Sequence, residues 1–188
     1  MGRMGQEKWK IEKWDKYYYE ICKAVANNSK CFSRKIGAVL VKDKIIVSTG
    51  YNGPPRDVPR CDERWKIDDS MLPTFGKLLQ DGIVSSSDDL RNRCPRQVMG
   101  FKSGEAIDLC PAAHAEENTI LNAARLGICT KDTKMYMTCG VPCGKCMVKI
   151  INAGIEEVIV TELNFYDKLS RYLIDNGTVK LRKFSFLQ

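Results

Sequence analysis

The spacing of hydrophobic residues predicts a helix near the start of the chain, followed by a β-hairpin. Over residues 8–28, aromatic and aliphatic side chains recur every three or four positions, which is the period of a helix with one buried face. Two short β-rich runs follow, at 37–41 and 45–48, separated by Lys42, Asp43 and Lys44. We therefore expect an antiparallel hairpin, ended by a loop at 50–55.

The C-terminal half alternates between helical and strand-like segments. Helices are expected at about 114–126, 143–153 and 166–176, and strands at 133–138, 156–161 and 178–184. Gly127 and Gly154 stand where the first two of these helices should end. Because helix–strand alternation favours parallel strands, we expect an α/β fold. Its mixed five-stranded sheet would continue the hairpin with parallel strands and carry helices on both faces.

Residues 54–110 show neither the hydrophobic period of a helix nor that of a strand. This stretch is rich in Pro, Asp and Ser and contains Cys61, Cys94 and Cys110. A loop-rich segment of this length seldom becomes ordered without a covalent or metal crosslink. The length of 188 residues suits one domain, so we predict a single domain over 1–188 with an insertion at about 54–110.

Composition narrows the class of protein. The chain has 44% hydrophobic and 28% charged residues, which is typical of a soluble globular protein. It contains neither a membrane-spanning run nor the apolar segment of a signal peptide, so we expect a cytoplasmic protein. Its nine cysteines then favour metal ligation over disulfides. The net charge of +7 suits a nucleic acid or a phosphorylated small molecule and does not distinguish them.

The candidate chemistry centres on the single histidine, His114, and on Cys143 and Cys146. Zinc prefers nitrogen and sulfur ligands, and a catalytic site uses three protein ligands with one open position. Cysteines three residues apart share one face of a helical turn, and the positive end of a helix dipole favours their thiolate form. We expect these three residues to bind a catalytic zinc. Alone, the cysteine pair would equally suit a structural zinc knuckle or a redox pair.

The full pattern, His-x-Glu followed by Pro-Cys-x-x-Cys, is the signature of zinc-dependent nucleobase deaminases. In these enzymes the glutamate is the general acid and base, which moves protons from an activated water to the ring and the departing amine. Helical spacing alone does not choose between Glu116 and Glu117. The family pattern assigns the catalytic role to Glu116.

From about residue 29 to 183 the chain resembles the deoxycytidylate (dCMP) deaminase family of the cytidine deaminase-like superfamily, in its viral and bacterial two-zinc type. The motifs are Ser-Arg-Lys-Ile-Gly-Ala-Val at 33–39, Gly-Tyr-Asn-Gly-Pro-Pro at 50–55, His-Ala-Glu-Glu-Asn at 114–118, Pro-Cys-Gly-Lys-Cys at 142–146 and Tyr-Asp-Lys at 166–168. Gly-Tyr-Asn-Gly and the cysteine-bearing insertion resemble dCMP deaminases more than free-nucleoside or tRNA deaminases. The resemblance implies a three-layer α/β/α fold and conversion of dCMP to dUMP and ammonia, which supplies thymidylate synthesis.

The resemblance also implies residue roles. The substrate-binding residues would be Ser33, Arg34, Lys35, Asn52, Ala115 and Tyr166. Within this set, Asn52 would bind the deoxyribose, the 33–35 segment would bind the 5′-phosphate, and Tyr166 would close the other side. The alternatives are that Asn52 is only a turn residue and that the charged segment is only solvated.

A second zinc and allosteric control are implied as well. A structural zinc would be held by Cys31, Cys61, Cys94 and Cys110, whose alternative role is that of buried, unpaired thiols. Similar enzymes are hexamers, activated by dCTP and inhibited by dTTP, with Mg²⁺ accompanying the triphosphate. The expected effector contacts are Gly53 and Pro54.

Other functions remain open at this point. The enzyme could also accept dCTP as a substrate. It could instead resemble a tRNA adenosine deaminase, which the positive charge favours; the absence of an aromatic and basic strand-binding stretch disfavours it, and we do not expect a nucleic-acid partner. A zinc-stabilised binding module with a vestigial site is disfavoured by the intact His114, Glu116, Cys143 and Cys146.

Overall fold

The computed structural model describes residues 3–102 and 104–187, and the chain divides into two compact units. The first unit contains the segments up to Ser29, Ile36–Asn52 and from His114 onward. The second contains Lys30–Lys35 and Gly53–Ala113. The predicted insertion at 54–110 therefore makes up most of the second unit.

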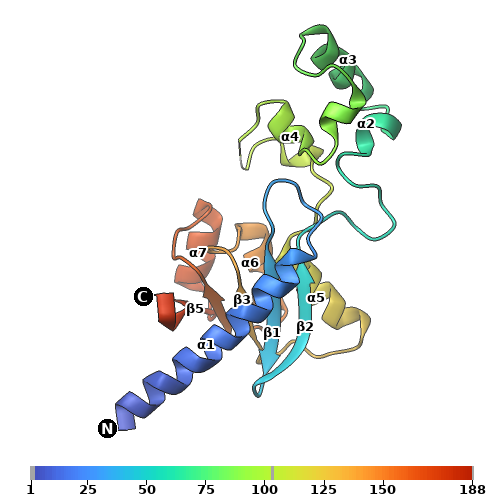
Figure 1. Ribbon diagram of the computed structural model, residues 1–188. Coiled ribbons are helices and arrows are strands. Elements are labelled where there is room, and N and C mark those ends of the chain that lie inside the picture. The colour runs from blue at the N-terminus through green and yellow to red at the C-terminus, as the bar shows by residue number, and fades with distance from the viewer. Residues whose placement is uncertain (1–2, 103, 188) are drawn as a thin grey trace. The chain divides into compact units, whose positions relative to one another are not determined.

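The first unit is built on a five-stranded sheet with the order β2-β1-β3-β4-β5 (Figure 1). The strands are β1 (Gly37–Lys42), β2 (Ile45–Tyr51), β3 (Lys134–Met137), β4 (Glu157–Val160) and β5 (Lys180–Lys183). Strand β1 is antiparallel to both β2 and β3, whereas β3, β4 and β5 are parallel. The predicted mixed sheet, a hairpin continued by parallel strands, is confirmed.

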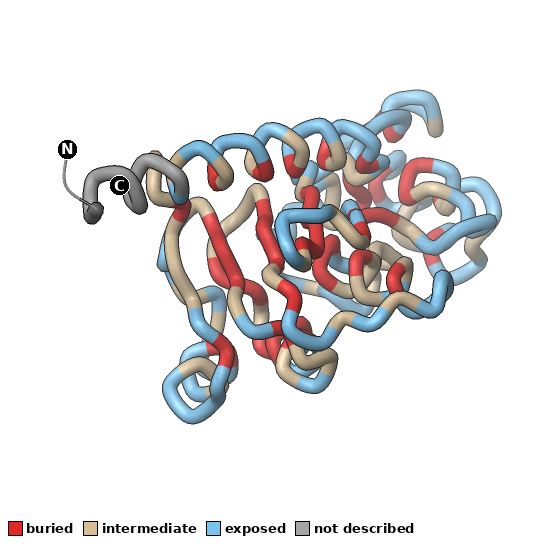
Figure 2. Tube along the Cα trace, turned by 90° about the horizontal axis from the view of Figure 1, so that it is seen from below, coloured by how far each residue is buried: buried red, intermediate tan, exposed pale blue. Residues whose placement is uncertain are grey.

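Helices cover both faces of this sheet, because its strands bury hydrophobic side chains on both sides. On one face, Val39, Tyr136 and Ile159 pack against Tyr18 and Cys22 of α1 (Arg3–Asn27). The other face packs against α5 (Ala115–Arg125), α6 (Gly144–Asn152) and α7 (Lys168–Asn176). Figure 2 shows the buried residues of α1 turned toward the strands. The expected α/β/α layering is confirmed, and α1 begins several residues earlier than predicted.

Gly127 and Gly154 follow the ends of α5 and α6, as predicted, with φ angles of 67° and 70°. In the part of the chain that the structure describes, no helix combines the length and the apolar character needed to cross a membrane.

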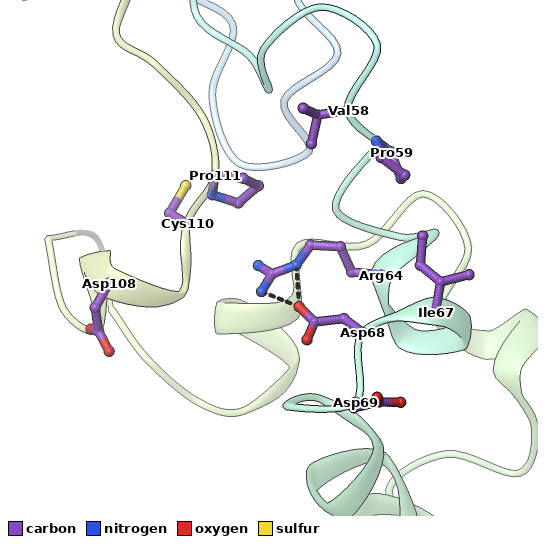
Figure 3. Close-up of a pocket in the computed structure, with 9 residues that line it drawn as sticks. All are labelled: Val58, Pro59, Arg64, Ile67, Asp68, Asp69, Asp108, Cys110 and Pro111. Carbon is purple, nitrogen blue, oxygen red and sulfur yellow. Dashed lines mark hydrogen bonds and ion pairs between the residues drawn. The ribbon is translucent and has the colours of Figure 1, made fainter.

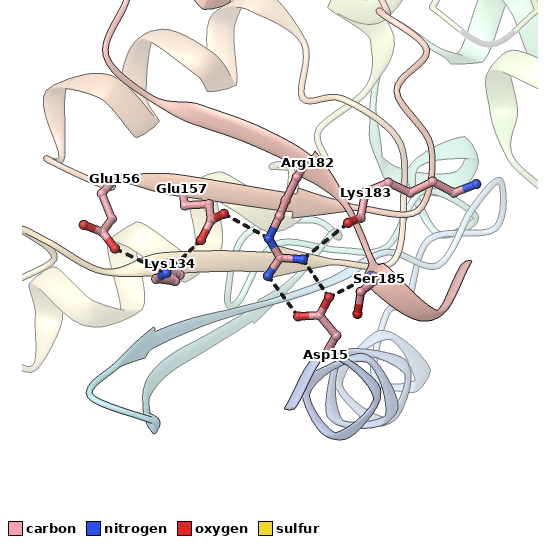
Figure 4. Close-up of polar contacts among 7 residues, drawn as sticks. All are labelled: Asp15, Lys134, Glu156, Glu157, Arg182, Lys183 and Ser185. Atoms are coloured by element: carbon pink, nitrogen blue, oxygen red, sulfur yellow. Dashed lines mark hydrogen bonds and ion pairs between the residues drawn. The ribbon is translucent and has the colours of Figure 1, made fainter. Parts of the chain in front are cut away.

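A buried ion-pair network ties α1 to the far edge of the sheet (Figure 4). Asp15 of α1 is 1% exposed and accepts two hydrogen bonds from Arg182 of β5, at 2.6 and 2.9 Å. Arg182 also donates to Glu157 of β4 at 2.9 Å, and the backbone N–H of Ser185, in the short 3-10 helix η3 (Ser185–Leu187), donates to Asp15 at 2.8 Å. The hydrogen bonds from Arg182 and Ser185 offset the free-energy cost of burying the charged carboxylate of Asp15.

The second unit contains short helices around a small core of its own. The helices are α2 (Arg64–Ile67), α3 (Leu72–Gln80) and α4 (Pro95–Val98), with the 3-10 turns η1 (Ser87–Leu90) and η2 (Ile107–Leu109). The buried residues of this core are Trp65, Met71, Leu78, Val84 and Leu90. Periodicity did not reveal these helices because most span little more than one turn. The rest of this unit consists of turns and loops.

Candidate functional site

Two helices begin at the candidate metal ligands. His114 is the N-cap residue of α5 and Cys143 is the N-cap residue of α6, and neither side chain makes a capping hydrogen bond. Instead, the two side chains face each other across the helix starts. The Nδ1 atom of His114 lies 3.5 Å from the sulfur of Cys143 and 3.3 Å from that of Cys146.

These three residues fit a catalytic zinc. Their ligand atoms all lie within 4.8 Å of one another, and they are the one such group of His, Cys, Asp and Glu found in the described residues. Zinc–nitrogen bonds of about 2.0 Å and zinc–sulfur bonds of about 2.3 Å in a tetrahedron separate N and S by about 3.5 Å. The observed separations are therefore those that zinc requires, with one nitrogen and two sulfur donors.

The electrostatics of the site favour the thiolate form. A hydrogen bond from the Cys146 thiol lowers the pKa of Cys143 to about 4. The same contact, together with burial, raises the pKa of Cys146, because the two sulfurs share one proton. A hydrogen bond with Cys143 raises the pKa of His114 above its ordinary value. Since metals bind the thiolate, this arrangement is ready for a cation that would displace the remaining proton.

The two glutamates after His114 have different surroundings. Glu116 is 5% exposed, and burial raises the pKa of its carboxyl group. The Cys146 side chain acts on the pKa of Glu116 in the opposite direction, so this carboxyl group lies close to the ligand set. Glu117 lies at the surface instead, where it accepts a hydrogen bond from Lys149 at 2.5 Å. Helical spacing did not decide which glutamate is the catalytic acid and base. Burial now favours Glu116, as the family pattern does.

The Glu117–Lys149 pair joins the two helices that carry the ligands. Glu117 stands three residues after His114 on α5, and Lys149 stands three residues after Cys146 on α6. The sequence gives no local signal for this pair, because its members are 32 residues apart.

Asn52 lies directly after β2 and is almost fully buried. Its Oδ1 atom accepts hydrogen bonds from the backbone N–H of Ile36 at 2.8 Å and from the hydroxyl of Ser29 at 2.9 Å. Nearby, the side chain of Asn118 on α5 donates to the carbonyl oxygen of Tyr51 at 2.8 Å. Asn52 is thus fixed in place next to the start of α5, which is more than a solvated turn residue requires.

Two further predicted residues lie in the first unit. Ala115 is fully buried at the first position of α5. Tyr166 is 48% exposed and directly precedes Asp167, the N-cap residue of α7.

The remaining predicted substrate and effector residues belong to the second unit. Ser33, Arg34 and Lys35 are all exposed, and the side-chain amide of Gln97 donates to the Ser33 hydroxyl at 3.4 Å. Gly53 forms an isolated β-bridge with Ala113, and Pro54 follows it. The bridge consists of two backbone hydrogen bonds, of 3.1 and 2.9 Å.

The second unit contains four cysteines, Cys31, Cys61, Cys94 and Cys110. Among the described residues, they do not form a group whose ligand atoms lie close enough together to hold a metal ion. Burial and then the nearby thiols of Cys110, Cys31 and Cys94 raise the pKa of Cys61 to about 11. No disulfide joins cysteines in the described part of the chain. Arg64 and Cys110 both line a pocket of about 560 Å³ (Figure 3). The Arg64 guanidinium donates to Asp68 and to the carbonyl oxygen of Leu109, next to Cys110.

Comparisons with known proteins agree with the site. Residues 12–162 match the family described as "Cytidine and deoxycytidylate deaminase zinc-binding region". Deoxycytidylate deaminase of Mycobacterium phage D29 is 30% identical over 151 residues, covering 78% of this chain and 92% of the phage protein. Deoxycytidylate deaminase of Schizosaccharomyces pombe is 30% identical over 171 residues, which cover 91% of this chain and 44% of the yeast protein. The chain thus spans less than half the length of the yeast relative.

A solved structure shares the fold. The apo dCMP deaminase from cyanophage S-TIM5 superposes with a TM-score of 0.58 at 18% identity, covering 90% of this chain and 95% of that one. The expected cytidine deaminase-like fold is confirmed.

Proposed function

The chain belongs to the cytidine and deoxycytidylate deaminase family, and we propose that it hydrolyses dCMP to dUMP and ammonia. The observation that carries the proposal is the buried carboxyl group of Glu116 beside a group of one nitrogen and two sulfur ligands. The phage relative named for dCMP deamination is matched over nearly its whole length, which supports this substrate. The dUMP produced would supply thymidylate synthesis.

His114, Cys143 and Cys146 would hold the zinc. When bound, zinc would supply the Lewis acidity that brings the pKa of a water close to neutrality. Hydrolysis at C4 of cytosine requires protons to pass from water to N3 and to the departing amine. Glu116 would take and return these protons, and its raised pKa suits exchange in both directions.

Asn52 would recognise the deoxyribose. Because its Oδ1 atom already accepts from Ile36 and Ser29, the amide nitrogen, which carries two hydrogens, would donate to a sugar oxygen. Ala115, next to Glu116, would contact the substrate from the start of α5.

Recognition of the 5′-phosphate is the second part of this proposal. Ser33, Arg34 and Lys35 would contribute a hydroxyl, backbone N–H groups and positive charge, and the Tyr166 hydroxyl would contribute a further hydrogen bond. The exposure of all four side chains supports a role in binding a ligand from solution.

A structural zinc is proposed for Cys31, Cys61, Cys94 and Cys110. The support is that Cys110, Cys31 and Cys94 each raise the pKa of Cys61, so each of these three thiols lies within electrostatic range of Cys61. A closed four-thiolate site would contribute directly to the folding of a unit whose own hydrophobic core is small.

Regulation by nucleotides is also proposed. The enzyme would be a hexamer, activated by dCTP and inhibited by dTTP, with Mg²⁺ accompanying the triphosphate and with Gly53 and Pro54 as effector contacts. The support is that Gly53 is hydrogen-bonded through its backbone to Ala113, the residue directly before the metal ligand His114. Sigmoidal dCMP kinetics that dCTP makes hyperbolic would support this, and indifference to both triphosphates would refute it.

The test of the main proposal is a substrate panel. Ammonia release and the uracil product would be measured with dCMP, dCTP, deoxycytidine, cytidine and an RNA stem-loop, with and without dCTP and Mg²⁺ as activator. We expect dCMP to be the preferred substrate. Turnover of the stem-loop alone would refute the proposal and would favour a nucleic-acid deaminase, whereas turnover of dCTP as well would widen the substrate class.

A further inference from the structure

One carboxylate, that of Asp167, caps two helices. Its Oδ1 atom accepts a hydrogen bond from the backbone N–H of Ser170 at 2.6 Å, within its own helix α7. Its Oδ2 atom accepts from the backbone N–H of Gly144 at 2.9 Å, at the start of α6. Gly144 directly follows the metal ligand Cys143, so Asp167 contacts the ligand-bearing turn through the backbone.

Helix α6 needs such a partner from outside. The first N–H groups of any helix lack an intrahelical acceptor, and a Ser, Thr, Asp or Asn at the N-cap position usually supplies one. In α6 that position is occupied by Cys143, which makes no capping hydrogen bond because its sulfur faces His114. Asp167 therefore replaces the cap that the ligand cannot provide.

The packing around this contact is tight. A Cβ atom on Gly144 would lie 2.6 to 2.7 Å from the side chain of Leu169, so only glycine permits α7 to approach α6 this closely. The segment between Asp167 and Leu169 thus lies directly on the first turn of α6. Tyr166 precedes Asp167 in the chain, so the position of its backbone depends on the same contact.

We propose that Asp167 is a positioning residue, which holds Tyr166 at a fixed place relative to the zinc-binding turn of α6. Its role in catalysis rests on the proposed function, in which Tyr166 contacts the substrate phosphate. The capping role stands on the hydrogen bonds alone. Although burial acts in the opposite direction, the N–H groups of Gly144 and Ser170 lower the pKa of Asp167, as expected for a carboxylate that is charged while it caps.

Three variants separate this role from a general effect on stability. Asp167→Ala removes both acceptors. Asp167→Asn retains one acceptor oxygen and replaces the other by a donor, so it should satisfy one helix and not both. Asp175→Ala is the matched control, since Asp175 lies on the same helix in an exposed ion pair with Arg171.

Amide hydrogen exchange of the zinc-loaded protein, followed by NMR, tests the capping role. We expect Asp167→Ala to speed exchange at Gly144 and Ser170 by about fivefold, as loss of a helix cap predicts, and Asp175→Ala to leave both unchanged. Asp167→Asn should retain protection at one of the two amides. Unchanged exchange at Gly144 in Asp167→Ala would overturn the proposal.

Kinetics test the link to Tyr166. We expect Asp167→Ala to raise KM for dCMP by about fivefold with kcat within about twofold, and to leave deoxycytidine, which has no phosphate, unaffected. In a Tyr166→Phe background the same change should have little further effect. If Asp167→Ala impaired turnover of dCMP and deoxycytidine equally, or impaired dCMP turnover equally in the wild-type and Tyr166→Phe backgrounds, the link between Asp167 and Tyr166 would be overturned. If the wild type does not turn over dCMP, the proposed function fails, and the exchange measurement alone decides the capping role.

Discussion

Glu116 and Glu117 are neighbours in the sequence, yet only one is suited to proton transfer. Glu116 is buried beside the ligand group with a raised pKa, whereas Glu117 pairs with Lys149 at the surface. Asp15 is equally buried, but Arg182 holds it in a bidentate pair that leaves it structural. The surroundings of each carboxylate, and not its residue type, set its role.

Asp167 gives a prediction for acid stability. Because its folded pKa is lowered, its stabilisation is present above its unfolded pKa of about 3.9 and is lost as pH falls through the folded value. Wild type should therefore exceed Asp167→Asn in free energy of unfolding by about 1 kcal/mol near neutral pH, and the difference should vanish in strong acid. Urea unfolding over a pH series measures it. A difference that is constant down to strong acid would contradict this account.

At the scale of elements, the site depends on how closely β2 approaches α5. A Cβ atom on Gly50 would collide with the backbone N–H and side chain of Thr119 and with the carbonyl oxygen of Ala115. The glycine therefore brings the strand that leads to Asn52 against the helix that starts after His114. This contact brings Asn52, from the N-terminal half of the chain, close to His114, from the C-terminal half.

We predict that Gly50→Ala destabilises the protein by about 2 kcal/mol, because the new methyl group meets backbone atoms that cannot rotate away. The matched control is Gly76→Ala in α3, where nothing lies within 4 Å and alanine favours the helix. Thermal or urea unfolding compares the two variants. Equal stability of Gly50→Ala and wild type would show that β2 and α5 can separate without cost.

The Glu117–Lys149 pair should tune metal affinity, because it links the helix that begins after His114 to the helix that carries Cys146. Lys149→Glu creates a like-charge contact and removes a cation near the thiolates, so we expect zinc affinity to fall by about threefold. The double variant Glu117→Lys with Lys149→Glu restores the pair and should recover part of this loss. Competition with a chromophoric chelator measures both. A double variant weaker than the single one would exclude the pair as the cause.

At the scale of the whole molecule, patterns that are local in sequence were predictable. Alternating helices and strands predicted the mixed sheet. The group of His114, Cys143 and Cys146 joins segments 29 residues apart, and it was predicted from the known zinc-deaminase pattern and not from local spacing. Other contacts between distant segments were not predictable. Asp15 and Arg182 are 167 residues apart, and no periodic signal links them.

The second unit was the least predictable part, for two physical reasons. Its helices are too short to show a period, and its core draws on residues spread from Trp65 to Leu90. The capping contact of Asp167 was missed for a related reason: its partner is a backbone N–H group, which has no side-chain signature.

The proposed structural zinc gives a prediction for this unit. Metal analysis of the purified wild-type protein should find about two zinc ions per chain, and the same analysis of the Cys94→Ser variant should find about one. The variant should also lose folding of the second unit, seen as proteolysis within 54–110. Cys129→Ser is the control, since Cys129 is exposed and is not one of the four proposed zinc ligands. One zinc per chain in intact wild-type protein would refute the second site.

The role of Glu116 in proton transfer is tested most directly by comparing wild type with Glu116→Gln, in deamination of dCMP and in zinc content. We expect wild type to release ammonia and dUMP, and Glu116→Gln to bind zinc equally well while its kcat falls by about a thousandfold or more. A Glu116→Gln variant that keeps both zinc and activity would contradict the assignment of proton transfer to this buried carboxyl group.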